Sequence, residues 1–443
     1  MKKIIARLLV LTMILTALTG CGSKGNNQTS TDNKNANSGT NTENTGSTDT
    51  AATPTEEALS GKIVVATNMT NLVDTTLADL AKEFMDAHPG TTVEFEAIKD
   101  YENVISTRVA GGEAPDLFQV IDGMSQDTYA DYFKPIDDLD INFDNFLFSK
   151  NTTGNDGKIY AISDSVNYTG VVYNKAAFRQ AGITDVPKTM DEFWDVCAKL
   201  KAAGITPMGT AFKDVWPIYP WVSWDMVQVT LNGNTQGKNV YVNQDEIFDK
   251  TMLESMNTIR KMYQMNYLEK DIISANWDQF KLDISQGKTA MFYAETWFPA
   301  QVVEGGAKSE DVGMFPFPGA KAVFSVPGKS WGISKDCKDT AVAEAFLKFM
   351  LEGGKYALAC NTLPSDKTVQ NTDPYAAELL SYGVSVSECE IPDAAFTNIK
   401  NEIELDEQSF LMSYVLESDD TKAQAMVDEW NKKWAEARPN FVK

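Results

Sequence analysis

Residues 61–96 read GKIVVATNMTNLVDTTLADLAKEFMDAHPGTTVEFE, and this stretch decides the fold class. Residues 63–66 form a short apolar run, which is typical of a strand that is buried on both faces. Apolar side chains then recur at helical spacing over residues 77–85, and the helix is expected to end at His88. Residues 92–96 alternate as a strand does. A strand, a helix and a second strand predict a parallel crossover, and therefore an α/β sheet with helices on its faces.

Composition excludes several classes of function. The 443 residues include 62 Asp and Glu against 39 Lys and Arg, for a net charge of −23. Binding to a nucleic-acid backbone or to anionic lipid headgroups requires a basic face, so the acidic balance argues against both. The one histidine, His88, lies at a predicted turn without ligand spacing around it. Histidine-dependent catalysis is therefore not expected, and neither a metal nor a cofactor is predicted. The length suffices for two or three domains.

The N-terminus has the parts of an export signal. Basic residues precede an apolar run over residues 8–18, which is too short to span a bilayer. The run ends in LTGC at residues 18–21, which resembles the bacterial lipobox; an ordinary signal peptide with an incidental cysteine is the alternative. The lipobox resemblance implies a signal peptide over residues 1–20 and lipidation of Cys21. Residues 21–59 are rich in Ser, Thr, Asn and Gly, and a disordered tether is predicted there.

Four cysteines follow the tether. An exported chain can pair them, and four cysteines allow three connectivities. Cys197 lies on the apolar face of a predicted helix over residues 191–201, for which Thr189 is the expected N-cap, so a buried thiol is favoured there. Whether Cys337, Cys360 and Cys389 form a disulfide stays open.

Several fragments of the body resemble, in order, segments of extracellular solute-binding proteins of the maltodextrin-binding type. The fragments are the helix and strand at residues 78–98, TRVAGGEAPDLF at 107–118, GKIYAI at 157–162 with VVYNK at 171–175, PKTMDEF at 187–193, QGKTAM at 286–291 and GMFPFP at 313–318. Met190 departs from the family, which usually has an aromatic residue there. Together the fragments span about residues 60–350, and the lipobox with its tether is what a Gram-positive member would carry.

The resemblance implies two discontinuous α/β lobes joined by a hinge of crossing strands, the type II fold of periplasmic binding proteins. By analogy, the first lobe is predicted over residues 60–168 plus 288–331, and the second over 169–287 plus 332–443. The implied function is capture of an extracellular carbohydrate, expected to be an oligosaccharide, in the cleft between the lobes. A monomer would then deliver the sugar to the permease transmembrane subunits of an ABC importer, held at the outer membrane face by its lipid. No enzyme activity is implied.

Candidate ligand contacts come first from aromatic residues, because rings stack on the apolar faces of sugars while carboxylates and amides pair with hydroxyls. One proline-rich stretch holds Asp214, Trp216, Trp221 and Trp224, of which the first two align with an acidic and aromatic pair in the family. Trp297 aligns with a stacking tryptophan of the family. Glu295 stands where the family often has glycine, so it would bind hydroxyls or a cation. Packing in the core is the alternative for the tryptophans.

Further candidates lie at strand ends and at the predicted chain crossings. Ligands of open α/β sheets bind at the carboxyl ends of strands, which points to Asn68 and Asp122. The candidates at the crossings are Asp164, Asn167 and Tyr168 at the first and Trp331 at the second.

Two alternative functions remain open from the sequence. The same importer role is compatible with a cationic or peptidic solute, because Glu295 and the net charge favour cations. A surface-anchored glycoside hydrolase requires two carboxylates about 5–10 Å apart and no histidine, which the abundant Asp and Glu residues would supply.

Overall fold

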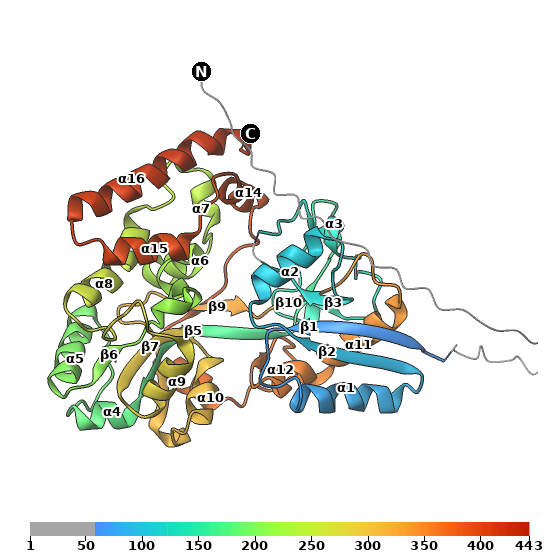
Figure 1. Ribbon diagram of the computed structural model, residues 1–443, viewed down its shortest axis with the longest axis horizontal. Coiled ribbons are helices and arrows are strands. Elements are labelled where there is room, and N and C mark those ends of the chain that lie inside the picture. The colour runs from blue at the N-terminus through green and yellow to red at the C-terminus, as the bar shows by residue number, and fades with distance from the viewer. Residues whose placement is uncertain (1–57, 122, 443) are drawn as a thin grey trace, which may run out of the picture. The chain divides into compact units, whose positions relative to one another are not determined.

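Two β-sheets organise the part of the chain that the computed structural model describes, residues 58–121 and 123–442 (Figure 1). The predicted signal peptide, Cys21, the tether up to residue 57 and Asp122 lie outside the described residues. We call the elements built on the first sheet the first lobe and those built on the second sheet the second lobe. The mixed α/β architecture confirms the predicted fold class.

The first sheet has the strand order β2-β1-β3-β10-β4. Its strands are β1 (Gly61–Thr67), β2 (Thr91–Ala97), β3 (Leu117–Gln119), β4 (Ile162–Ser163) and β10 (Ser330–Ile333). Its helices are α1 (Thr76–Ala87), α2 (Tyr101–Ala110), α3 (Tyr129–Tyr132), α11 (Thr340–Leu351) and α12 (Lys355–Ala359). The predicted crossover is confirmed, because β1 and β2 pair in parallel with α1 between them in the chain. Ile63 and Val65 pack on one face with Leu77 of α1, whereas Ala66 belongs to the core on the other face.

The second sheet is built around the long strand β5, which pairs antiparallel with β7, β8, β9 and β11. Its strands are β5 (Ser165–Asn174), β6 (Thr206–Met208), β7 (Thr289–Glu295), β8 (Val312–Phe315), β9 (Val323–Pro327), β11 (Leu363–Pro364) and β12 (Val386–Ser387). The helices that precede β9 in the chain are α4 (Lys175–Gln180), α5 (Met190–Ala202), α6 (Trp224–Val227), α7 (Asn239–Val242), α8 (Lys250–Gln264), α9 (Trp277–Ser285) and α10 (Phe298–Glu304). Those that follow are α13 (Pro374–Ser381), α14 (Ala394–Glu402), α15 (Glu407–Leu416) and α16 (Asp420–Ala437).

Local signals in the second lobe agree with the sequence analysis. Thr189 is the N-cap of α5, and its Oγ1 accepts from the Glu192 N–H while the Glu192 carboxylate accepts from the Thr189 N–H. Cys197 is buried, as predicted, and all four cysteines of the described residues are free thiols. None of the described helices combines the length and the apolar character needed to cross a membrane.

The structure differs from the predicted division of the lobes over two segments. The prediction assigns residues 288–331 to the first lobe, but β7, β8 and β9 all lie in the second sheet. It assigns residues 332–443 to the second lobe, but α11 and α12 pack on the first sheet. The physical reason is β5, which is buried along almost its whole length and takes its antiparallel partners from residues 289–327.

Three chain segments pass between the lobes side by side, and they form the hinge. The first crosses at Asp164, between β4 and β5, and the second at residues 328–329, between β9 and β10. The third, between α12 and β11, is a crossing that the resemblance did not indicate. The Gly328 N–H donates to the Ser165 carbonyl at 2.8 Å, and the Ser365 N–H donates to the Asp164 carbonyl at 3.0 Å. Backbone hydrogen bonds therefore join both the second crossing and Ser365, just after β11, to the first crossing.

The Asp164 side chain is buried inside this hinge. Its Oδ1 accepts from Ser165 Oγ at 2.7 Å, and its Oδ2 accepts from Trp331 Nε1 at 3.2 Å. Trp331 itself is fully buried in the core of the first lobe. Asp164 and Trp331, both predicted as ligand contacts, therefore contact each other inside the hinge, which ties the first crossing to the strand that follows the second.

Asp164 should make the stability of the fold depend on pH. Burial raises the pKa of its carboxyl to about 6, against about 3.9 in an unfolded chain. The folded chain binds this proton more tightly, so stability is lost as the pH rises from about 4 through about 6. Asp164→Asn should raise the free energy of unfolding by about 2–3 kcal/mol at pH 7.5 relative to the unsubstituted chain, and much less at pH 4, in denaturant melts.

The control for this substitution is Asp79→Asn on the exposed face of α1, which should change stability little at either pH. An effect of Asp164→Asn that is equal at both pH values would contradict a carboxyl that titrates within the hinge.

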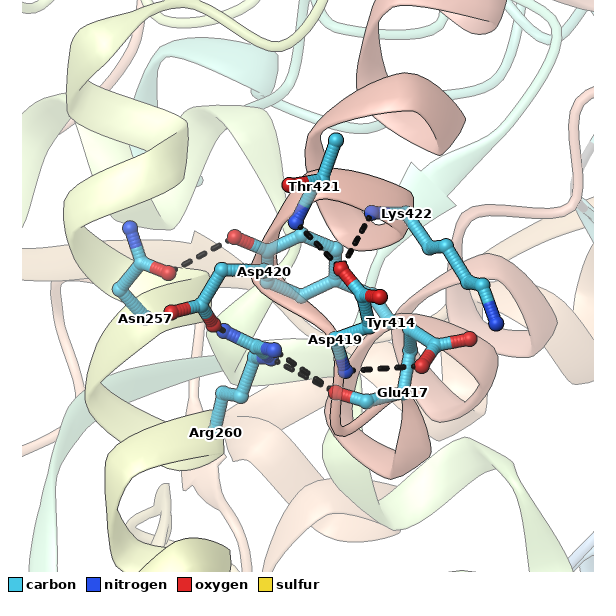
Figure 2. A network of polar contacts seen from close by, with 8 residues as sticks. All are labelled: Asn257, Arg260, Tyr414, Glu417, Asp419, Asp420, Thr421 and Lys422. Carbon is cyan, nitrogen blue, oxygen red and sulfur yellow. Dashed lines mark hydrogen bonds and ion pairs between the residues drawn. The ribbon is translucent and has the colours of Figure 1, made fainter.

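The C-terminal helices are held to the second lobe through Arg260 of α8 (Figure 2). Its Nε and Nη2 donate to the Glu417 carbonyl, just after α15, at 3.2 and 2.7 Å. Its Nη1 pairs with Asp420 at 2.7 Å, and its guanidinium lies over the Tyr414 ring. Tyr414 in turn donates to Asn257 of α8 at 2.7 Å. One buried cation therefore holds the end of α15 and the start of α16.

Removal of this cation should loosen the C-terminal helices. Arg260→Met should lower the free energy of unfolding by about 2 kcal/mol, because hydrogen bonds from a charged donor to the Glu417 carbonyl are lost, as measured by urea denaturation. The matched control is Asp420→Asn, since the Asp420 side chain is 85% exposed and exposed ion pairs contribute little. Equal losses from both substitutions would show that the ion pair, not the carbonyl contact, holds the helices.

Candidate functional site

Three tryptophans meet beside the carboxyl end of β7 in the second lobe. Trp216 begins a 3₁₀ turn (Trp216–Trp221), Trp277 begins α9, and Trp297 directly precedes α10. Ring centroids are 4.6 Å apart for Trp216 and Trp277, 6.1 Å for Trp216 and Trp297, and 6.0 Å for Trp277 and Trp297. Trp216 is 39% exposed and the other two are half-buried. We call these three residues the tryptophan cluster.

The cluster rests on a rigid apolar base. Trp277 packs against Phe280, Phe292 and Phe298, whose rings also contact one another. The backbone N–H of Trp277 donates to Asp214 Oδ2 at 2.5 Å. This bond ties the start of α9 to the stretch that leads into Trp216. Asp214 is exposed, so its carboxylate both fixes the cluster and faces solvent.

Backbone strain lies directly before Trp216. The preceding residue, Val215, has φ 63° and ψ −60°. A β-branched residue at positive φ is a conformational outlier that costs on the order of 1–3 kcal/mol. Trp216 follows this residue and contacts Trp277, whereas Trp221 at the end of the same turn is buried in the core.

Glu295, the last residue of β7, lies buried beside the cluster. Its Oε1 accepts from Tyr219 Oη at 2.6 Å, and its Oε2 accepts from Trp297 Nε1 at 3.1 Å. Burial raises the pKa of the Glu295 carboxyl, while the two donors and the charge of Lys329 act in the opposite direction. The sequence predicts Glu295 as a ligand contact, but both of its oxygens accept hydrogen bonds from the second lobe. Its position makes it the residue that orients Trp297.

The start of β5 brings the hinge next to this site. Thr169 pairs with Glu295 in the register of β5 and β7. Tyr168 and Thr296 are joined twice, since the Tyr168 N–H donates to Thr296 Oγ1 and the Thr296 N–H donates to the Tyr168 carbonyl, each at 3.1 Å. Asn167 accepts from Thr296 Oγ1 at 3.4 Å. The predicted contacts Asn167 and Tyr168 therefore lie with Glu295 and Trp297 in one locality.

Charged and polar groups of the first lobe and the hinge complete the candidate site. Lys329, at the second crossing, is close enough to influence Glu295 electrostatically. Its Nζ also pairs with Glu102 of α2 at 2.6 Å. Asn68, directly after β1 in the first lobe, is exposed. Lys329 therefore links the second crossing to the first lobe next to the tryptophan cluster.

Two predicted tryptophans lie away from the cluster. Trp221 is 2% exposed and packs edge-on against Tyr293 and Phe317. Trp224 is 4% exposed, and its Nε1 donates to the Ile247 carbonyl at 2.9 Å. The 3₁₀ turn carries the chain inward after Trp216, so both rings occupy the core of the second lobe, which is the alternative that the sequence left open.

Sequence reasoning missed four residues of this site. They are Tyr219, Trp277, Lys329 and Glu102. Tyr219 lies in the same proline-rich stretch as Trp216, so its proximity in the sequence could have identified it as a candidate site residue. Trp277 follows the N-cap Asn276, but nothing local distinguishes it from a core tryptophan. The partners of Lys329 and Glu102 are far away in the chain.

The role of Glu295 is testable without any ligand. Glu295→Ala removes the acceptor for Trp297 Nε1, so the tryptophan should lose its fixed orientation and the near-ultraviolet circular dichroism should weaken. Glu295→Gln should keep most of the signal, because the amide oxygen still accepts from Trp297 and the amide N–H donates to Tyr219 Oη. If both variants lose the signal equally, the hydrogen bond to Trp297 does not orient the ring.

Comparisons with known proteins give a consistent result. Residues 66–353 match the family model described as bacterial extracellular solute-binding protein. The chain is 25% identical over 297 residues to the multiple sugar-binding protein of Streptococcus mutans, covering 64% of this chain and 69% of that protein. It is 28% identical over 315 residues to the diacetylchitobiose binding protein DasA of Streptomyces coelicolor, covering 66% and 71% of the two chains.

Solved structures of similar fold include sugar complexes. A binding protein of an ABC transporter from Bifidobacterium animalis subsp. lactis, in complex with mannobiose, has a TM-score of 0.75 at 20% identity and covers 86% of this chain and 95% of its own. The protein RafE in complex with raffinose has a TM-score of 0.68 at 20% identity, with coverage of 86% and 100%. At these identities the structures establish the shared fold.

Proposed function

Because the chain belongs to the bacterial extracellular solute-binding proteins, we propose that it captures a carbohydrate, expected to be an oligosaccharide, and delivers it to a permease of an ABC importer. The observation that carries the proposal is the tryptophan cluster beside the hinge of two lobes, with Glu295 fixing Trp297. The relatives named for sugar binding and the sugar-bound structures of the same fold support it.

The geometry of the cluster favours a ligand with more than one sugar ring. The planes of the three indoles are inclined to one another by 46° to 60°. Stacking requires a ring face that lies nearly parallel to the indole, so one pyranose cannot stack on all three at once. A chain of sugar units presents several apolar faces at different angles. Asp214, Asn68 and the pair of Lys329 and Glu102 are the polar groups available for hydroxyls.

Capture would proceed by closure of the lobes about the hinge. A cleft between two domains is where small-molecule sites commonly form, and bending at a few crossing residues is how such clefts close. Here the crossings meet at Asp164, and the same strand β5 continues to Asn167 and Tyr168 beside the cluster. Binding and release need no chemical step, so no catalytic residue is assigned.

The protein acts outside the cell membrane, as its family does. We further propose that Cys21 carries a lipid and that the tether holds a monomeric binding body at the outer face of the membrane. Acyl chains supply membrane affinity by burial of their methylene groups, and the LTGC sequence supports this assignment. The permease transmembrane subunits are the proposed partners, and no nucleic acid is involved.

A cationic or peptidic solute has less support. That alternative depended on a free carboxylate at Glu295, whereas Tyr219 and Trp297 engage both of its oxygens and Lys329 is close enough to influence its charge. A neutral ligand fits this charge balance better.

The test is thermal unfolding of residues 22–443 against a panel of oligosaccharides, polyamines and peptides. One glycan class at 100 times its Kd should stabilise the chain by about 2.7 kcal/mol, which raises the melting temperature by a few degrees. Trp216→Ala and Trp297→Ala should abolish the shift, while Trp430→Ala on α16 should keep it. Glu295→Gln should weaken the binding of a neutral sugar only slightly. A shift with polyamines or peptides alone, lost in Glu295→Gln, would overturn the carbohydrate proposal.

A further inference from the structure

The lobes also touch each other away from the hinge, through a loop of the first lobe and through α14 with the two residues before it in the second. The two sides are residues 123–127, between β3 and α3, and residues 392–401. In Figure 1, α14 and α3 lie on the same side of the two sheets, which fits the hydrogen bonds between these segments. We call this contact the clasp. Its members on the first lobe are Gly123, Ser125, Gln126 and Asp127, and on the second Pro392, Asn398 and Asn401.

Asn398 is the central residue of the clasp. Its Nδ2 donates to Asp127 Oδ2 at 3.1 Å, and its Oδ1 accepts from Ser125 Oγ at 3.0 Å. Both ends of one amide are thus matched by complementary groups of the other lobe. The single hydroxyl proton of Ser125 is shared between the Asn398 amide oxygen and Asp127 Oδ1, which belongs to the same loop as Ser125.

Two further hydrogen bonds flank this pair. Asn401 Nδ2 donates to the Gly123 carbonyl at 3.1 Å, and Gln126 Nε2 donates to the Pro392 carbonyl at 2.7 Å. Every bond across the clasp named here uses a side-chain donor, so none depends on continuous secondary structure. Such bonds form only when the two lobes have this relative orientation.

The two sides of the clasp are not tightly packed against each other. Between its two sides lies a small cavity of about 80 Å³, lined by Met124 and Tyr129 of the first lobe and by Lys238 and Ala394 of the second, among others. A permanent interface would be packed without such a gap and would be dominated by apolar contacts. Polar groups that water can replace make the closed and open states close in free energy, so small changes shift the population between them.

We propose that the clasp is a closure latch, which holds the lobes together and raises ligand affinity without contact with the ligand. The inference rests on the proposed function, because a binding protein gains affinity when its competent state is more populated. The clasp residues are positioning residues, since they act through the relative placement of the lobes.

An exchange of partners tests the latch. Asn398→Asp places two carboxylates about 3 Å apart across the lobes, where like charges repel. The double variant Asp127→Asn with Asn398→Asp restores an amide and a carboxylate in reversed order. The matched control is Gln424→Glu on α16, where Gln424 Nε2 donates to Asp428 at 2.9 Å within one helix. This control creates the same kind of repulsion inside one lobe.

The first readout needs no ligand. Nitroxide labels are attached to cysteines introduced by Asp79→Cys on α1 and Lys199→Cys on α5. Cys389 is replaced by alanine so that it is not labelled. Electron–electron double resonance then reports the distance between the two labels, one on each lobe. Asn398→Asp should enlarge the population of longer distances, and the double variant should restore the original distribution. Gln424→Glu should leave the distribution unchanged.

The second readout is affinity for a sugar that binds the unsubstituted chain, with mannotriose and raffinose as the first probes. Asn398→Asp should raise Kd about tenfold or more, and the double variant should return it to within about threefold. If Asn398→Asp leaves the distances between the two labels unchanged, the latch proposal is wrong. It is also wrong if the distances change but the Kd for the sugar stays the same. If no panel sugar binds the unsubstituted chain, the proposed function fails, while the label distances still decide whether the clasp holds the lobes.

Discussion

The hydrogen bonds around Asp164 are the constraint on which the rest of the structure depends. Three chain segments pass between two sheets, and the second and third are each hydrogen-bonded to the first within one residue of Asp164. Because the crossings are short, the relative placement of the lobes is set by a few torsion angles there. The carboxyl is held by neutral donors, Ser165 Oγ and Trp331 Nε1, in a buried site where an unpaired charge would be costly. The hinge thus joins the first lobe to a second lobe that carries the tryptophan cluster.

The candidate site continues directly from that hinge along β5. Its register with β7 sets Thr169 opposite Glu295, and Glu295 in turn fixes Trp297 and Tyr219. A change in the direction of β5 at the crossing would therefore move the tryptophan cluster as one body relative to the first lobe. The clasp closes the lobes at a second place, where a loop of the first lobe meets α14. In the proposed closure, the hinge, the tryptophan cluster and the clasp move together, and only the tryptophan cluster is expected to touch the ligand.

In the tryptophan cluster, apolar contacts hold the rings in place and polar contacts orient them. The phenylalanine base under Trp277 supplies the burial that holds the rings in place, while Glu295 and Asp214 set their orientation through hydrogen bonds. A strained residue, Val215, directly precedes Trp216. A partly exposed aromatic surface of this kind next to the hinge is typical of a binding surface.

The sequence by itself determined the features that depend on neighbours along the chain. Local spacing predicts the crossover of β1, α1 and β2, and the order of these three elements predicts the fold class. Local spacing also predicts the N-cap at Thr189 and the buried thiol of Cys197. Only the tertiary structure decided which of several tryptophans form the candidate site, because Trp216 and Trp221 lie five residues apart in one turn yet face solvent and core respectively. It also decided the lobe boundaries, since antiparallel pairing of β5 with β7 and β9 joins residues more than a hundred positions apart. Contacts at that separation leave no periodic pattern in the sequence, because burial and partner choice are properties of the packed fold.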